Sequence, residues 1–331
     1  MNVFITGEKG FIAKNLTERS KGYDSVNVVT GCDKISRDKL TYEVLHTGEP
    51  CVFTNEIRRW KDFFNEQKID VVIHNAATVG TDVVALDPKH STLTNVTGTY
   101  NICRAAKELG IAVCYIGTTV IYDTPKYQSS QIFENSDRKP NTLYGCHKLC
   151  AEDIVKSQTD KWMIVRPLFA YGGEGDMNSL IAKTIYTALT DSEDLHMFLD
   201  PTKIKDYMHV NDFCDAVWEC IITPHCWNED FNVAAEIPYM TGEIVSMISK
   251  ILDRDVSGLI RWFPKTDYLG NHMLSAEKIK CATIWEPKIS LKRGIVMSYS
   301  SIVNTMGRTG YNPLKYLEEA DRRDIDLTKF Y

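Results

Sequence analysis

The sequence predicts an α/β protein, with a doubly wound parallel sheet followed by a smaller mixed α/β lobe. Short apolar runs rich in Val and Ile alternate along the chain with segments of helical spacing. These runs are nearly continuous, as expected for parallel strands that helices cover on both faces. With 331 residues, 44% of them hydrophobic and 25% charged, the chain is long enough for a large domain and an appended lobe.

The elements of the sheet can be assigned in order from the N-terminus. We predict strands within 2–6, 25–30, 69–77, 111–119, 161–173 and 230–235. Helices are predicted within 11–20, 56–67, 91–110, 143–157 and 206–223, the last after a short strand end and an N-cap. A weaker α/β rhythm in 174–189, 242–255, 260–265 and 277–304 indicates the mixed lobe. The sheet domain is therefore expected to span 1–170 plus about 206–236, the lobe about 171–205 and 237–305, and a charged C-terminal arm 306–331.

Charge and composition exclude several classes of protein. A net charge of −6 argues against a nucleic-acid binder, which needs clustered Lys and Arg. No run of 18 apolar residues and no basic leader with an apolar core is present, so we expect a cytoplasmic protein that does not enter a membrane. Cys146, His147 and Cys150 do not have the spacing of a zinc motif, and no metal site is expected.

The first turn, "TGEKGFIA", predicts a dinucleotide site. Gly7 and Gly10 allow a positive φ and a close approach of the backbone to a pyrophosphate, and Ala13 lets the following helix pack against the sheet. The N-terminus of that helix would face the phosphates. The candidate cofactor-binding residues of this turn are Gly7, Lys9, Gly10, Phe11 and Ile12. The predicted sheet domain is thus Rossmann-type and binds NAD(P), which leaves the lobe for the substrate.

The choice between NAD and NADP is open from the residues. Asp33, slightly late after the second strand, could take the adenine ribose hydroxyls. Lys9, Lys34 and Arg37 could equally meet a 2′-phosphate. Because the strand itself ends in Thr30 and Gly31 without an acid, NADP is weakly favoured.

Two further stretches point to the same site. Asn75, Ala76 and Ala77 end a strand, at the edge where ligands of open α/β sheets bind, and their small side chains admit a cofactor. In "YGCHK", Tyr144 and Lys148 are four residues apart and share one face of a predicted helix. Such a pair is common by chance, so its meaning depends on the rest of the chain.

Six motifs occur in the order and spacing of a known family. They are "TGEKGFIA" (6–13), "HNAA" (74–77), "GTTVIYD" (117–123), "YGCHK" (144–148), "VRPLFAYG" (165–172) and "KDYMHVNDFCDAV" (205–217). Over about residues 1–300 the chain resembles the extended short-chain dehydrogenase/reductases, in particular the NAD(P)-dependent nucleotide-sugar epimerase/dehydratase group.

The resemblance implies a chemistry. Tyr144 would be the catalytic base, Lys148 would hold the nicotinamide ribose and favour the phenolate, and Thr118 would bond the reacting sugar oxygen. Thr119 stays a candidate for that last role. The resemblance also implies cofactor contacts at Asn95 and Pro167, substrate contacts at Thr119, Val120, Phe169 and Lys205, and a homodimer through the helices that start near Ser91 and Tyr144.

Departures from the family pattern narrow the reaction. Dehydratases of the group carry two carboxylates where this chain has Thr119 and Val120, and the double epimerases need a Cys at Val120. A C4 epimerase that works through a transient 4-keto sugar is therefore favoured, with an NADPH-dependent keto-sugar-nucleotide reductase or a dehydratase as alternatives. Many members of the family have an Asn where this chain has Phe169, and an Arg where it has Lys205. A non-catalytic dinucleotide-binding protein therefore stays open as a less favoured interpretation.

Overall fold

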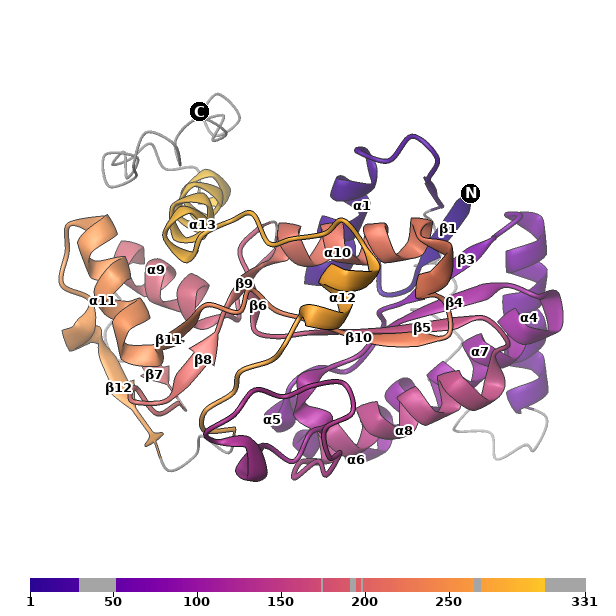
Figure 1. Cartoon of the computed structure of the whole chain (residues 1–331), viewed down its shortest axis with the longest axis horizontal. Coiled ribbons are helices and arrows are strands. Elements are labelled where there is room, and N and C mark those ends of the chain that lie inside the picture. The colour runs from indigo at the N-terminus through magenta and orange to yellow at the C-terminus, as the bar shows by residue number, and fades with distance from the viewer. Residues whose placement is uncertain (30–51, 174, 191–194, 198, 265–268, 307–331) are drawn as a thin grey trace.

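The structure is a computed structural model that describes residues 1–29, 52–173, 175–190, 195–197, 199–264 and 269–306. Within these residues a six-stranded parallel sheet has the strand order β10-β5-β4-β3-β1-β2 (Figure 1). Its strands are β1 (Asn2–Ile5), β2 (Asn27–Val29), β3 (Val71–His74), β4 (Ala112–Ile116), β5 (Trp162–Pro167) and β10 (Glu229–Val233). The predicted doubly wound sheet is confirmed.

Helices cover both faces of this sheet because its strands are apolar on both sides. Val113 and Tyr115 of β4 face the core under α4 (Val52–Glu66), α7 (Gly98–Leu109) and α8 (Leu143–Gln158). Cys114 and Ile116 face the opposite core, under α1 (Phe11–Ser20), α10 (Val210–Ile222) and α12 (Glu277–Ala282). The period of two along β4 thus divides its side chains between the two cores.

The strand order reverses at β1. The chain leaves β1 for β2 on one side and then returns to β3 on the other, so the two connections run in opposite directions. In open α/β sheets a crevice forms outside the carboxyl ends of the strands at such a switch point, and ligands bind there. This places the residues that follow β1 and β3 at the edge where a ligand is expected.

A second, smaller lobe has a core of its own. Its helices α9 (Leu180–Thr190), α11 (Thr241–Leu252) and α13 (Leu291–Thr305) pack together to one side of the sheet (Figure 1). Three short strand pairs accompany them: β6 (Ala170–Tyr171) with β9 (Met208–His209), β7 (Leu195–Met197) with β12 (Ile260–Trp262), and β8 (Ile204–Asp206) with β11 (Pro238–Met240).

The packing also bears on the expected domain division. Ile279 of α12 and Trp285, both within the stretch 237–305 assigned to the lobe, belong to the core under the sheet together with Phe231 of β10. The domain division stays a prediction, and 307–331 of the expected arm lie outside the described residues. No helix in the described part of the chain combines the length and apolarity that crossing a membrane requires.

Shorter elements complete the described part of the chain. They are α5 (Thr81–Leu86), α6 (Pro88–Thr92), η1 (Leu93–Thr97), η2 (Thr119–Ile121), η3 (Thr124–Tyr127), η4 (Pro224–Cys226) and η5 (Ser257–Leu259). The helix predicted over 91–110 is therefore not uniform, because a π-helical turn at η1 separates α6 from α7. Such turns insert one extra residue and are frequent at functional sites.

Candidate functional site

The turn after β1 brings the backbone of Gly7 against the loop after β3. Gly7 has φ 70°, and a Cβ atom there would lie 3.0 Å from the Ala76 Cα. Gly10 differs from the expectation: its φ is −73°, an ordinary value for the N-cap of α1. At Gly10 only small size matters, because a Cβ would lie 3.1 Å from the Gly7 oxygen. Phe11 and Ile12 follow in the first turn of α1, partly buried against the core.

The loop after β3 is held by a chain of hydrogen bonds that sequence reasoning missed. Thr6 Oγ1 accepts from the amides of Asn75 (3.0 Å) and Ala76 (2.9 Å) and lies 2.8 Å from His74 Nδ1. With both acceptor positions used, the Thr6 hydroxyl donates to Nδ1, which leaves Nε2–H of His74 to donate to Thr99 Oγ1 at 3.0 Å. Burial, together with nearby Lys148, lowers the pKa of His74 to about 3 and keeps the ring neutral.

Asn95, a predicted cofactor residue, lies in the π-helical turn η1 and is 1% exposed. Its side-chain oxygen accepts from the Thr78 amide at 2.7 Å, and its Nδ2 donates to the Thr78 carbonyl at 3.0 Å. Asn95 thus fixes the chain just beyond Ala77. The predicted residues Asn75, Ala76 and Ala77 are held at the carboxyl end of β3 from both directions.

Helix α8 carries the Tyr144 and Lys148 pair, as predicted. The Thr142 hydroxyl caps it by accepting from the Gly145 amide at 3.1 Å. A Cβ at Gly145 would lie 2.8 Å from the Val120 carbonyl oxygen, so the first turn of α8 rests directly on η2. This contact brings the turn with Tyr144, which is partly buried, beside the segment that follows β4.

Lys148 is buried one turn further along α8. Its side chain is 3% exposed, its Nζ donates to the Ile116 carbonyl at 2.6 Å and lies 4.2 Å from the centre of the Tyr115 ring. Burial lowers the pKa of Lys148 to about 7, and the Glu152 carboxylate opposes that shift. Thr118, the N-cap of η2, follows Ile116 by two residues and is partly exposed, whereas Thr119 is only 4% exposed.

The two departures from the family pattern lie together. The Phe169 ring stacks on Tyr207 at 5.4 Å, meets His272 edge-on at 5.9 Å, and has the Lys205 Nζ 5.4 Å from its centre. Phe169 has φ 30°, in the left-handed region that large side chains seldom adopt. It packs against both the sheet core and the lobe core, so it lies where the two meet.

The other predicted residues lie on different elements of the structure. Pro167 ends β5 and Lys9 is exposed in the first turn, whereas Lys205 is fully buried in β8. Asp33 lies outside the described residues. Among the side chains that are described, no group of three or more His, Cys, Asp or Glu is arranged to hold a metal ion.

Sequence reasoning also missed the charged side chains behind the site. Arg166 of β5 is fully buried and pairs with Glu152 of α8. A signal for them was available, because a charged residue inside the apolar run "MIVRP" is buried and must have a partner.

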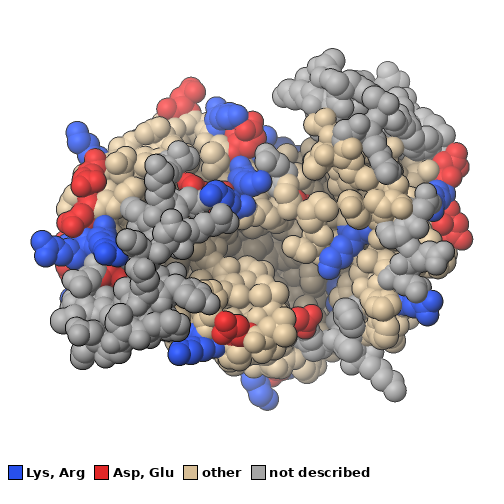
Figure 2. All heavy atoms as spheres, turned by 180° about the vertical axis from the view of Figure 1, so that it is seen from behind, with Lys and Arg blue, Asp and Glu red and all other residues tan. Residues whose placement is uncertain are grey.

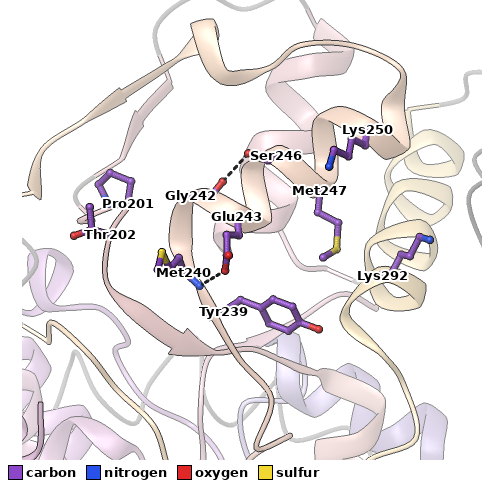
Figure 3. Close-up of a pocket in the computed structure, with 10 residues that line it drawn as sticks. All are labelled: Pro201, Thr202, Tyr239, Met240, Gly242, Glu243, Ser246, Met247, Lys250 and Lys292. Atoms are coloured by element: carbon purple, nitrogen blue, oxygen red, sulfur yellow. Dashed lines mark hydrogen bonds between the residues drawn. The ribbon is translucent and has the colours of Figure 1, made fainter. Parts of the chain in front are cut away.

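The surface is hollowed on the face opposite that of Figure 1, near its middle, and the visible walls of the hollow are mostly uncharged (Figure 2). A pocket of about 700 Å³ lies in the lobe, between the start of α11 and Lys292 of α13 (Figure 3). Glu243 accepts from the Met240 amide at 2.8 Å in its wall. None of the predicted site residues lines this pocket.

Comparison with known proteins bears on the family and the fold. The model of the NAD-dependent epimerase/dehydratase family matches residues 3–234. The chain is 26% identical over 258 residues to GDP-6-deoxy-D-talose 4-dehydrogenase of Aggregatibacter actinomycetemcomitans, which covers 76% of this chain and 80% of that protein.

Solved structures share the fold. UDP-glucuronic acid 4-epimerase from Bacillus cereus, in complex with UDP-glucuronic acid and NAD, has a TM-score of 0.76 at 20% identity, covering 92% of this chain and 100% of its own. RMD from Pseudomonas aeruginosa, complexed with NADPH, has a TM-score of 0.75 at 20% identity, covering 91% and 98%. With a family model spanning most of its sheet domain, this chain belongs to the NAD-dependent epimerase/dehydratase family.

Proposed function

We propose that this protein is an NAD(P)-dependent enzyme that transfers a hydride at C4 of a sugar linked to a nucleoside diphosphate, in a 4-epimerase cycle. One observation supports the proposal above the others. The contact of Gly145 with Val120 brings the Tyr144 turn of α8 beside the segment that begins at Thr118, while Lys148 lies beneath the end of β4. The segments that carry a candidate base, a cation and a hydroxyl thus meet at the carboxyl end of β4, which supports the proposal.

Each residue then has a role that its position supports. Tyr144 takes the proton from the C4 hydroxyl, and the Thr118 hydroxyl bonds the same oxygen. Lys148 holds the ribose hydroxyls of the cofactor and stabilises the Tyr144 phenolate by its charge. A bound nicotinamide supplies the hydride chemistry. Gly7, Gly10 and the N-terminus of α1 provide the amides for its pyrophosphate.

Epimerisation requires nothing more than these groups and a sugar that can turn between the two half-reactions. Net oxidation or reduction at C4 is the second candidate, and the relative named as a 4-dehydrogenase favours it. Dehydration is disfavoured, since Thr119 and Val120 offer no carboxylate to expel the C6 hydroxyl. The proposal retains a weak preference for NADP, supported by the absence of an acid at Thr30 and Gly31.

A turnover assay tests this function. The purified protein is incubated with UDP-, GDP-, CDP- and dTDP-linked sugars and with NAD, NADP or their reduced forms. Nicotinamide absorbance and mass spectrometry of the sugars are followed together. An isomer formed at constant absorbance identifies an epimerase, and stoichiometric change of absorbance identifies an oxidoreductase. Tight cofactor binding without any sugar conversion would instead support a dinucleotide-binding protein.

A homodimer is part of the proposal. Helices α7 and α8 lie side by side on one face of the sheet and expose Tyr100 and Leu143. A four-helix contact between two copies would cover these two side chains. Light scattering at micromolar concentration is expected to give twice the chain mass, and a monomer would refute this part of the proposal alone.

A further inference from the structure

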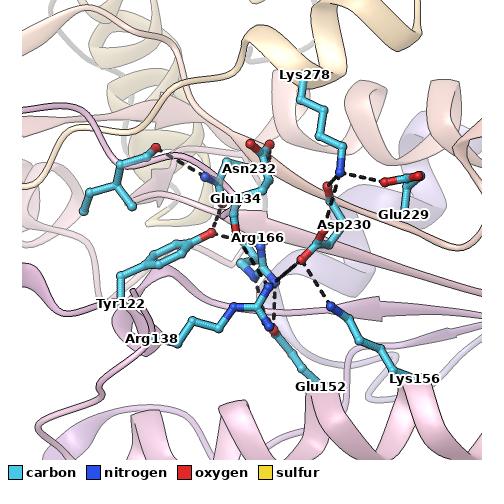
Figure 4. A network of polar contacts seen from close by, with 11 residues as sticks. Tyr122, Glu134, Arg138, Glu152, Lys156, Arg166, Glu229, Asp230, Asn232 and Lys278 are labelled. Carbon is cyan, nitrogen blue, oxygen red and sulfur yellow. Dashed lines mark hydrogen bonds and ion pairs between the residues drawn. The ribbon is translucent and has the colours of Figure 1, made fainter. Parts of the chain in front are cut away.

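A buried ion pair lies behind the proposed catalytic residues. Arg166 donates to both carboxylate oxygens of Glu152, from Nε and from Nη2, each at 2.8 Å, and neither side chain is exposed (Figure 4). Arg166 also donates to the Tyr122 hydroxyl at 2.9 Å and to Asp230 Oδ2 at 2.5 Å. The guanidinium therefore has acceptors on three elements: α8, the segment after β4, and β10.

This pair touches the strand end that carries the site. A Cβ atom at Gly117 would lie 2.9 Å from Arg166 Cγ and 2.9 Å from Glu152 Oε1. Gly117 stands between Ile116, which accepts from Lys148, and Thr118. The Glu152–Arg166 pair thus sets the distance between α8 and the end of β4.

The carboxylate of this pair also acts on Lys148. The ammonium lies over the Tyr115 ring of β4 and near the neutral His74 of β3, and the Glu152 carboxylate comes from the next turn of its own helix. Of these groups only Glu152 is an anion that favours the charged lysine against the cost of burial.

We propose that Glu152, held by Arg166, is a positioning residue that favours the charged form of Lys148 and keeps the end of β4 in register with α8. The inference rests on the proposed function, because that function assigns Lys148 and Thr118 their roles in catalysis. Arg166 holds the carboxylate in one orientation by a bidentate contact. Its bonds to Tyr122 and Asp230 allow the arginine to stay in place when the carboxylate is neutralised.

The test measures the titration of Lys148 in the ligand-free protein. NMR of the protein with 13C-labelled lysine follows the Cε signal with pH, and Lys148→Met assigns it. In Glu152→Gln the titration midpoint is expected to fall by about one pH unit or more, because an anion that favours the charged lysine is lost. Glu152→Asp keeps the charge and is expected to stay near the wild-type midpoint.

Asp230→Asn is the matched control. It removes a carboxylate from the same network, but on the far side of Arg166, where Arg138 and Lys156 also contact it. Its Lys148 midpoint is expected to equal that of the wild type. If Glu152→Gln does not fold, Glu152→Met removes the carboxylate at similar volume, leaves Arg166 bonded to Tyr122 and Asp230, and should lower the midpoint in the same way.

Activity gives a second readout. In Glu152→Gln the alkaline limb of kcat is expected to move to lower pH, with KM for the sugar little changed. An unchanged midpoint in the folded variants, or an equal shift in Asp230→Asn, would overturn the inference. The NMR result does not need turnover. A lowered midpoint in a protein that converts no sugar would leave the positioning role intact and remove the proposed function instead.

Discussion

The Nζ atom of Lys148 donates a 2.6 Å hydrogen bond to the main-chain carbonyl of Ile116, and this contact joins α8 directly to the end of β4. The lysine is buried where it does so, and its pKa falls from 10.5 to about 7. Burial of the Lys148 ammonium therefore lowers the free energy of unfolding, because the unfolded chain holds the proton more tightly than the folded one.

That cost predicts how stability depends on pH. Between pH 7 and 10.5 the unfolded state binds more protons at Lys148, so the free energy of unfolding rises with pH. Below pH 7 the penalty is fully present. Lys148→Met lacks this group, so the wild type should gain about 3 kcal/mol relative to it between pH 7 and 9.5. Urea unfolding at several pH values measures the difference, and a pH-independent difference contradicts the burial of a titrating lysine.

Removing the Tyr144 hydroxyl tests the proposed base. Tyr144→Phe is expected to lower kcat by about 10²- to 10⁴-fold, the usual contribution of a general acid or base, with cofactor affinity retained. Tyr186→Phe, which removes a hydroxyl from an exposed tyrosine of α9, is the control and should be indistinguishable from the wild type. NADH fluorescence titration and the sugar assay give the two quantities. Full activity in Tyr144→Phe would exclude Tyr144 as the base.

Much of the sheet could be predicted because its signals are local. The runs that became β1, β3, β4 and β5 are apolar and β-branched, and Gly110 ends α7 at φ 70° as a C-cap glycine should. The motif around Gly7 and the motif around Tyr144 are each a short continuous stretch of sequence, so each could be recognised locally. Ligands of open α/β sheets bind at the carboxyl ends of the strands, which predicts that both motifs lie at that edge.

Other features could not be predicted because they depend on long-range partners. Arg166, Glu152 and Asp230 come from β5, α8 and β10, and no local pattern states which acid a buried arginine will meet. The stacking of Phe169 on Tyr207 likewise joins two residues that are far apart in the sequence. The motif allows a positive φ at Gly10, whereas its φ of −73° depends on how Gly7 closes the turn.

Two glycines with the same φ allow the cost of backbone strain to be measured apart from the cost of a steric clash. Gly7 and Gly110 both have φ 70°, but a Cβ at Gly110 meets nothing within 4 Å, whereas at Gly7 it lies 3.0 Å from the Ala76 Cα. Gly110→Ala should therefore cost only the strain, about 1 kcal/mol of stability. Gly7→Ala must also displace the loop after β3, so its NADH affinity should fall at least tenfold, about 1.4 kcal/mol. Equal NADH affinities for the two variants would contradict a cofactor site at this turn.

Gly117 offers a steric test of the link between the ion pair and the site. A methyl group there would press on Glu152 Oε1 and Arg166 Cγ, both fully buried and unable to move aside, so Gly117→Ala should lose about 1–3 kcal/mol of stability. Because the displaced strand end carries Thr118, kcat should fall as well. Gly258→Ala is the control, since a Cβ at Gly258 meets nothing within 4 Å.

A double-mutant cycle identifies the cause of the Gly117→Ala loss. Glu152→Asp shortens the side chain and draws its carboxylate away from position 117, so it should relieve the clash when the two changes are combined. The stability loss of the double variant is then smaller than the sum of the single losses by at least about 0.5 kcal/mol. Simple additivity in urea unfolding would show that the added methyl group acts through other neighbours, such as Ile164, whose Cγ2 lies 3.3 Å from the same Cβ position.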